Sequence, residues 1–225
     1  MLLKSQWAAQ FVKACSTQRS AIRQVYSGGG LIYSTIPAGR CWAVKTGYVK
    51  LIDPRPDGNR FVRLILGRGS LLGDRPFEAQ AFRGFSAPQD EQAVAHGPAE
   101  VIELDRTELE NAAQQQPELA RLLLELAASR AQFLERRLLW QFTTPVRARI
   151  AAALRDLICF EGQRCRHGHT IDVRLTQQEL AELIGAARPV VSAELARMRK
   201  DGLVEYTRGY ICVEDLAGLN RIATA

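Results

Sequence analysis

The residues with the most defined chemistry lie between Thr176 and Gly202, in the segment TQQELAELIGAARPVVSAELARMRKDG. An arginine at the start of a helix that enters the major groove can pair bidentately with guanine, and later basic residues can hold phosphates. Arg188 fits the first of these roles. The segment therefore predicts contacts with double-stranded DNA, and the candidate residues are Thr176, Gln177, Gln178, Arg188, Pro189, Val190, Ser192, Arg197, Arg199 and Lys200.

Two helices joined by a tight turn would position these side chains. Thr176 and Glu179 have the pattern of a capping box, and a helix that starts there would end at Gly185, because glycine adopts the left-handed conformation at little cost. The second helix begins near Arg188-Pro189, since proline is suited to a first turn. The inner faces of the two helices are Leu180, Leu183 and Ile184, and Val191, Leu195 and Met198.

This spacing would also suit a helical hairpin with a solvated basic face. The segment Leu203–Val213, LVEYTRGYICV, favours DNA, because two strands with a turn at Arg208-Gly209 have the pattern of the wing in a winged helix. A second hypothesis, from another class of function, is a small-molecule sensor whose helix pair contacts protein rather than DNA.

Composition is that of an ordinary globular protein. The chain has 225 residues, enough for two modest domains, and is 47% hydrophobic with a net charge of +6, which suits a polyanionic partner. No apolar run is long enough to cross a membrane, and the start MLLKSQWAAQ becomes polar too early for a signal peptide. Five cysteines without an export signal indicate free thiols, so we expect a cytoplasmic location.

The first half of the chain has two other patterns. Residues 1 to about 25 predict a short helical lead, and from Ser27 to about Leu104 short apolar segments alternate with glycines. Regular short strands with such turns are typical of an antiparallel sandwich or barrel. Asp57-Gly58 is a hairpin signal, and Val101–Leu104 is the expected last strand.

A long helix is expected from Pro117 to about Phe142, after a helical region that starts at Asp105. Its apolar residues follow a three-four spacing, as in a coiled-coil seam, which Arg130 and Arg137 interrupt. A single apolar stripe must be buried, so we expect a homodimer; the alternative is that the stripe packs on the chain's own sandwich. The candidate dimer residues are Leu119, Leu123, Leu126, Phe133, Leu134 and Trp140.

This order of parts resembles the CRP/FNR superfamily of bacterial transcription regulators. The resemblance is carried by IPAGRCWAVKTGYVKLI, DGNRFVRLILGRGSLLGD and VIEL, and above all by TQQELAELIGAARPVVSAELARM. It implies an α+β fold with an N-terminal cyclic-nucleotide-binding-like β-roll (a double-stranded β-helix), a long dimerisation helix and a C-terminal winged helix-turn-helix. The implied partners are a palindromic DNA operator, a second copy of the chain and RNA polymerase, with no membrane.

Thr143-Thr144-Pro145 marks the boundary of the last domain, because threonine caps a helix and proline opens one. The following helix runs to about Ile158, and a short strand is expected at Thr170–Leu175. The expected domains are a β-roll sensor at 1–115, a dimerisation helix with its hinge at 116–143, and a winged helix-turn-helix DNA-binding domain at 144–225.

Within the superfamily the chain is most similar to cyanobacterial nitrogen regulators of the NtcA type, through SRAQFLE, TIDVRLTQQELAE and IGAAR. Those proteins bind 2-oxoglutarate between the roll and the long helix. One arginine and one glutamate of that helix take part, and they fall here on Arg130 and Glu135. A guanidinium is a suitable fork for a dicarboxylate, so 2-oxoglutarate is a candidate effector. The alternative is a structural ion pair of Arg130 with Glu135 of either subunit.

The effector pocket departs from the pattern of the superfamily. Cyclic-nucleotide binders carry Gly-Glu and then Arg-Ser/Thr on the phosphate, whereas this chain has Gly73-Asp74 and Gln89-Asp90. An aspartate repels a phosphate, so we expect no binding of cyclic AMP. NtcA-type sites also take an arginine from this segment, which only Arg83 could supply, so a lost or changed effector is the alternative. The candidate pocket is Leu72, Gly73, Asp74, Arg83, Gln89, Arg130 and Glu135.

The recognition helix departs as well. Relatives often show Arg-Glu-Thr-Val-(Ser/Thr/Gly)-Arg, where this chain reads RPVVSA from Arg188 to Ala193. Arg188 keeps the base-reading place, Pro189 offers only an apolar contact, such as one to a thymine methyl, and Ala193 lacks the second guanidinium. We therefore expect an operator related to the palindromes of the superfamily but with an altered sequence preference.

Other sites are weaker candidates. Cys159, Cys165, His167 and His169 are zinc-type ligands, but their spacing is not that of a zinc finger, so a solvated loop is expected and no metal site is predicted. A thiol redox sensor that uses the free cysteines is a third hypothesis. The sequence has no phosphate loop, nucleophile elbow or paired catalytic histidine, so we expect no enzyme.

Overall fold

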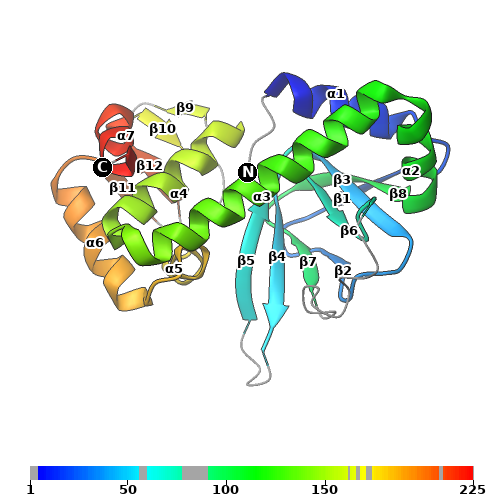
Figure 1. The fold of residues 1–225 in the computed structure, drawn as a ribbon. Coiled ribbons are helices and arrows are strands. Elements are labelled where there is room, and N and C mark those ends of the chain that lie inside the picture. Colours follow the sequence, from blue (N-terminus) through cyan, green and yellow to red (C-terminus); the bar gives the residue numbers. More distant parts are fainter. Residues whose placement is uncertain are drawn as a thin grey trace. The chain divides into compact units, whose positions relative to one another are not determined.

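A computed structural model describes residues 5–55, 60–77, 91–161, 163–165, 168–170, 174–207 and 210–224. The chain divides into two compact units, Met1–Ala131 and Gln132–Ala225. Strands dominate the first unit and helices the second, and the long helix α3, Pro117–Thr143, begins in one and ends in the other (Figure 1). This helix has the bounds that its proline start and apolar spacing predict.

Two four-stranded antiparallel sheets form the roll of the first unit within the described residues. One has the order β1-β8-β3-β6 and the other the order β2-β7-β4-β5, so strands far apart in the sequence pair with one another. The predicted β-roll is thereby confirmed. Its strands are β1 (Ile22–Tyr26), β2 (Leu31–Tyr33), β3 (Arg40–Thr46), β4 (Val49–Pro54), β5 (Arg60–Leu66), β6 (Leu71–Gly73), β7 (Gln92–Ala95) and β8 (Ala99–Asp105). The predicted turn residues Asp57 and Gly58 lie outside the described residues.

The helical lead is shorter than predicted. Helix α1 spans Ser5–Ser16 and buries Ala8, Phe11, Val12 and Cys15 at helical spacing. The prediction of a lead to about residue 25 is wrong, because Ile22–Tyr26 forms β1 and pairs with β8. That pairing joins residues some eighty positions apart, as in Ile22 with Glu103, so local spacing does not reveal it.

The first half of α3 packs within its own unit, after the short helix α2, Arg106–Gln115. Leu119, Leu123 and Leu126 are buried in the single chain, and the Arg121 guanidinium lies over the Trp7 ring of α1. Figure 1 shows α1 along this part of α3. These three leucines therefore belong to the chain's own core, which corrects their predicted place in a dimer seam, because side chains already buried are not available to a second copy.

The second unit places a helical core against a small sheet of order β11-β12-β10-β9. Of the strand predicted at Thr170–Leu175, Thr170 belongs to β10, residues 171–173 lie outside the described residues, and Leu175 is fully buried just before a helix. A C-terminal helix, which sequence reasoning missed, packs on α4. The elements are α4 (Val146–Glu161), β9 (Gln163–Cys165), β10 (Gly168–Thr170), α5 (Gln177–Ile184), α6 (Arg188–Lys200), β11 (Val204–Thr207), β12 (Tyr210–Val213) and α7 (Leu216–Thr224).

None of the described helices is both long enough and apolar enough to cross a membrane.

Candidate nucleic-acid interface and ligand site

Helix α5 begins and ends as its sequence predicts. The Glu179 amide donates to Thr176 Oγ1 at 3.1 Å, and the Thr176 amide donates to Glu179 Oε2 at 2.9 Å, which completes the capping box. Gly185 then ends the helix in the left-handed region, with φ of 64°. The tight turn that follows brings α6 against α5, so both predicted helices are present.

Replacing Thr176 with alanine should destabilise the second unit by about 1 kcal/mol, because the first turn of α5 loses a capping bond. Urea unfolding of the full chain measures this loss, and Thr176→Ser is the matched control, since serine keeps a hydroxyl acceptor. Equal unfolding midpoints for Thr176→Ala and the original chain would contradict the role of the cap.

Helix α6 packs through the predicted inner face, Val191, Leu195 and Met198, which are all buried. Its N-cap, Ala187, makes no side-chain cap bond, and a proline occupies the first turn. Of the ten predicted DNA-contact residues, Gln177 and Ser192 are half-buried and the other eight are exposed. Val190 is a large apolar side chain at 44% exposure. The exposed residues are Thr176, Gln178, Arg188, Pro189, Val190, Arg197, Arg199 and Lys200.

The basic residues of α6 differ in their ion pairs. Arg197 Nη1 lies 2.5 Å from Glu194 Oε1, and Arg199 Nη2 lies 2.8 Å from Glu205 Oε1. Within the described part of the chain, Arg188 and Lys200 make no such pair. Arg188 is therefore a guanidinium at the start of the helix whose donors remain available for a base, whereas Arg197 and Arg199 would first have to leave a carboxylate.

The end of α3 is fastened to α5 within the second unit. Gln141 Nε2 donates to the Ile184 carbonyl at 3.0 Å, Arg149 Nη1 donates to the same oxygen at 2.9 Å, and Arg137 donates to the Leu183 carbonyl. Burial lowers the pKa of Arg137. Cations at a helix C-terminus stabilise its unpaired carbonyls. Arg137, which interrupts the predicted seam, therefore couples the long helix to the helix pair.

A second site lies in the roll, where Arg130 points from α3 toward β6. Its Nη1 donates to the Leu71 carbonyl at a long 3.5 Å. Burial lowers the pKa of Arg130 to about 10, and the neighbouring Arg75 and Arg63 act in the same direction, whereas Glu91 opposes them. Among the described residues, three arginines, Arg130, Arg75 and Arg63, therefore lie close together in this part of the roll.

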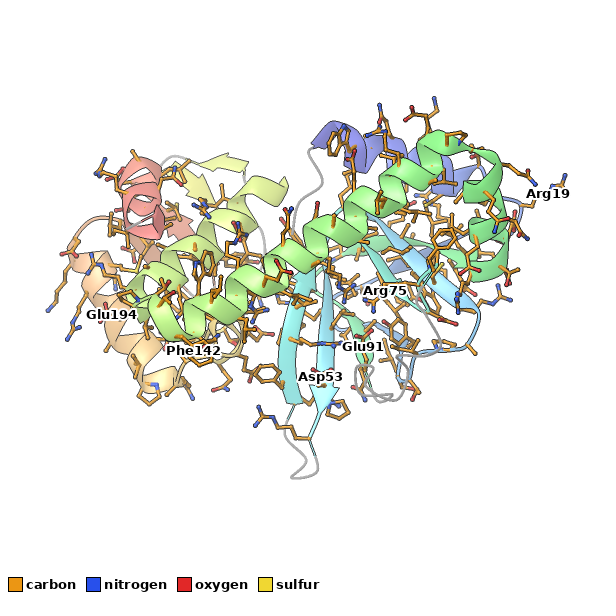
Figure 2. The ribbon with its side chains drawn as sticks, in the orientation of Figure 1. Arg19, Asp53, Arg75, Glu91, Phe142 and Glu194 are labelled. Carbon is orange, nitrogen blue, oxygen red and sulfur yellow. The ribbon has the colours of Figure 1, made fainter. Side chains whose placement is uncertain are left out.

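A buried polar network surrounds this charge. Tyr33 OH donates to Glu91 Oε1 at 2.5 Å, and Arg63 pairs with the other oxygen of Glu91 and with Asp53 Oδ2, the latter at 3.3 Å. Burial, reinforced by Glu91, raises the pKa of Tyr33, so the phenol stays protonated and donates. Burial also raises the pKa of Asp53, against the effect of Arg63. Figure 2 shows Asp53, Arg75 and Glu91 in the roll.

The predicted effector residues are only partly brought together. Leu72 is buried, and Gly73, at φ 86°, leaves no room for a Cβ beside the Arg40 carbonyl. Asp74 serves the structure, since it accepts from the Gly39 amide at 2.8 Å and pairs with Arg106 at 3.1 Å.

Glu135 is exposed and does not pair with Arg130, because the two lie five residues apart on the helix and so on different faces. The alternative of a structural pair within one chain is therefore wrong. Arg83 and Gln89 lie outside the described residues. Sequence reasoning missed Tyr33, Arg63, Arg75 and Glu91. One signal was available, because Arg63 is a charged residue inside the apolar run FVRLIL, which indicates a buried polar site.

The cysteines give little support to a redox site. Cys15 and Cys41 are free and fully buried, and burial raises the pKa of both thiols, that of Cys41 to about 12. Such thiols are poor nucleophiles at neutral pH. Cys212 is half-buried. The side chains of Cys159, Cys165, His167 and His169 lie outside the described part, and the part that is described holds no group of three metal-type ligands.

Comparisons with known proteins agree with this geometry. Residues 148–222 match the model of the Crp-like helix-turn-helix domain. The chain is 27% identical over 185 residues to the global nitrogen regulator of Nostoc sp., across 82% of this chain and 81% of that protein. It is 26% identical over 187 residues to the CRP-like cAMP-activated global transcriptional regulator of Mycobacterium tuberculosis, across 83% of this chain and 81% of that protein.

Solved structures agree as well. FixK2 from Bradyrhizobium japonicum has a TM-score of 0.72 at 20% identity and covers 91% of this chain and 98% of its own. A CRP-family transcriptional regulator from Thermus thermophilus has a TM-score of 0.70 at 25% identity, and the match covers 90% of this chain and 97% of that one. Together these likenesses confirm the predicted order of roll, long helix and helix-turn-helix, and the likeness to nitrogen regulators is one of low identity.

Proposed function

We propose that this chain, a member of the CRP/FNR superfamily of transcription regulators, binds a palindromic DNA operator as a homodimer. The observation that carries the proposal is the exposed N-terminal turn of α6 in a Crp-like helix-turn-helix, with Arg188 available to pair with a base. In this arrangement residues 1–115 sense, 116–143 dimerise and 144–225 bind DNA, in the cytoplasm. The relatives are transcription regulators, which is consistent with a protein that is not an enzyme.

On DNA, Arg188 would read guanine, with Pro189, Val190 and Ser192 beside it in the major groove. Thr176, Gln177 and Gln178 at the start of α5, with Lys200, would hold the phosphates, joined by Arg197 and Arg199 once these leave their carboxylates. Because such contacts release counterions, affinity should fall steeply with salt. A helix pair that contacts protein would lack this salt dependence, and no observation favours that alternative. At the promoters that it regulates, the dimer would contact RNA polymerase.

The dimer surface we propose is an exposed heptad stripe on α3. Leu124, Ala131 and Leu138 recur every seven residues, with Ala127 and Leu134 between them, and all five are exposed. Phe142 extends the stripe at 82% exposure (Figure 2). Of the dimer residues predicted from sequence, Leu134 belongs to this stripe.

Two other predicted dimer residues have contacts inside the chain. The Arg136 guanidinium lies 5.0 Å from the Trp140 ring centroid and 5.8 Å from that of Phe133. The proposed seam therefore lies about one position along the helix from the pattern that the sequence suggested, on an exposed side of α3.

Replacing Leu138 with alanine should weaken the dimer by about 1 kcal/mol per subunit, since it removes apolar surface from the centre of the stripe. Analytical ultracentrifugation across a concentration series measures the dissociation constant. Leu31→Ala is the matched control, because Leu31 is a similarly exposed leucine on β2, at 53% against 62% for Leu138. A monomeric original chain, or equal dissociation constants for the two variants, would count against the stripe.

For the effector we propose a small anion held by Arg130, with 2-oxoglutarate as the first candidate. Within the described part of the chain, Arg130 is a half-buried guanidinium with one long hydrogen bond and two neighbouring arginines, which favours an anion. Asp74, paired with Arg106, is not disposed to hold a ribose hydroxyl, which supports the expectation that cyclic AMP does not bind. The pocket would thus be a degenerate form of a cyclic-nucleotide site, without the residues that bind a cyclic nucleotide.

The Arg130→Gln variant should lose any rise in melting temperature that 2-oxoglutarate produces, because the carboxylate loses its charged partner. At a concentration of 100 times Kd the original chain gains about 2.7 kcal/mol by linkage, which is a measurable shift. Arg136→Gln, which changes an exposed arginine of the same helix, is the control. A shift that survives in Arg130→Gln would remove Arg130 from the site, and the absence of any shift in the original chain would exclude this effector.

A further inference from the structure

The side of α6 that points away from the protein is almost free of polar side chains. At 100° per residue, the positions opposite Val191, Leu195 and Met198 are Pro189, Ala193, Ala196 and Lys200, and Val190 flanks them. All five are exposed. We call Pro189, Val190, Ala193 and Ala196 the outward face of α6. Lys200 lies at the far end, three turns from the first residue of the helix.

This surface is unusual for a helix at the protein's exterior. Its four side chains offer only methyl and methylene groups, and they have neither a hydrogen-bond donor nor an acceptor. Apart from Lys200 at the far end, the charged residues of the helix lie to the sides, and two of them, Arg197 and Arg199, are paired with Glu194 and Glu205. The outward face can therefore contribute to recognition only through shape and apolar contact.

The major groove holds one apolar group at its base edges, the C5-methyl of thymine. The N-terminal residues of a recognition helix are those that reach the base edges. Pro189 and Val190 occupy this first turn, and Val190 is 44% exposed in the isolated chain, so it has surface to lose on binding. Pro189 has no amide hydrogen, which leaves the turn without a donor to a base or phosphate at that residue.

We propose that the outward face of α6 selects thymine by its methyl group, so that the operator half-site combines one guanine read by Arg188 with thymines that contact Pro189, Val190 or Ala193. The inference rests on the proposed function, because it needs α6 in the major groove. It deepens that function by stating which chemical feature of the operator, other than a hydrogen-bonding edge, the protein recognises.

The test starts from an operator selected from random duplex DNA with the full-length protein. Each thymine of a half-site is then replaced singly with deoxyuridine, which removes the methyl group and keeps the hydrogen-bonding edge. We expect about a fourfold loss of affinity at one or two positions, which corresponds to ~0.8 kcal/mol for one methyl-sized group. Uracil outside the half-sites should have no effect. Where cytosine is placed at a sensitive position, 5-methylcytosine should bind more tightly than cytosine.

A mutant cycle identifies the protein partner of the methyl. In Val190→Ala, replacement of the sensitive thymine by uracil should cost less than it costs the original chain, because the contact is already missing. Val25→Ala, which changes an exposed valine of β1, should retain the full fourfold loss. Circular dichroism confirms that both variants are folded.

The outcomes separate the two claims. If a specific operator is selected but uracil is neutral at every half-site thymine, the methyl inference is overturned and the proposed function stands. If uracil sensitivity is the same in Val190→Ala as in the original chain, the contact is not made by Val190, and the same cycle is repeated with Pro189→Ala and Ala193→Gly. Unchanged sensitivity in all three variants would overturn the inference. If no operator is selected, the proposed function and the inference both fail.

Discussion

The Arg188→Ala variant is expected to bind the cognate operator roughly 5- to 150-fold more weakly than the original chain, a loss of about 1–3 kcal/mol. Arg188 is exposed at the first turn of α6, and within the described residues it makes no ion pair that would have to be broken before it meets a base. Affinity for random DNA should change far less, since a single phosphate contact is worth little there. Fluorescence anisotropy with labelled operator and scrambled duplex, at one fixed salt concentration, measures both affinities.

Arg197→Ala is the matched control. It removes a guanidinium from the same helix, but one that is paired with Glu194 at 2.5 Å in the free protein. Its effect should be small and similar for operator and random DNA, as expected of a phosphate contact. If Arg188→Ala lowered both affinities by the same factor, Arg188 would be a phosphate contact and not a base reader.

The Glu91→Ala variant should destabilise the roll by about 3 kcal/mol, the lower end of the range for a buried ion pair broken from one side. Glu91 is 3% exposed and joins Tyr33 to Arg63, and its loss leaves the phenol without this acceptor and removes a negative charge that acts on Arg130. Arg63 keeps Asp53 as a partner, which limits the damage. Urea unfolding measures the loss without adding ions that screen the charges.

Two controls make the Glu91 experiment specific. Glu118→Ala removes an exposed partner of Arg121 and should cost well under 1 kcal/mol, because exposed pairs contribute little. Glu91→Gln keeps an acceptor for Tyr33 and should lose less than Glu91→Ala. A Glu91→Ala loss no larger than that of Glu118→Ala would show that the network does not hold the roll together.

The helix pair could be predicted from sequence because its determinants are local. The capping box of Thr176 and Glu179, the left-handed Gly185 and the inner face of α6 each depend on residues within one or two turns, and each is present in the structure. The bounds of α3 followed in the same way from Pro117 and the apolar spacing.

Features that depend on distant pairing were not accessible in this way. Ile22–Tyr26 has a pattern compatible with the end of a helix and becomes a strand only because β8 is there to pair with it. Apolar spacing on α3 identified an amphipathic helix. It could not show that one row of apolar residues is buried in the chain's own core while a second row, one position away, is exposed. Glu91 and Arg63 lie nearly thirty residues apart, so their ion pair appears only when β4, β5 and β7 form one sheet.

Selection from random duplex DNA, followed by anisotropy of the selected site against a scrambled one at fixed salt, tests the central claim most directly. The account predicts a two-fold palindrome with half-sites one helical turn apart, bound at least a thousandfold more tightly than the scrambled duplex and with an affinity that falls steeply with salt. Equal affinity for the selected and scrambled duplexes, in protein shown to be folded and dimeric, would contradict it.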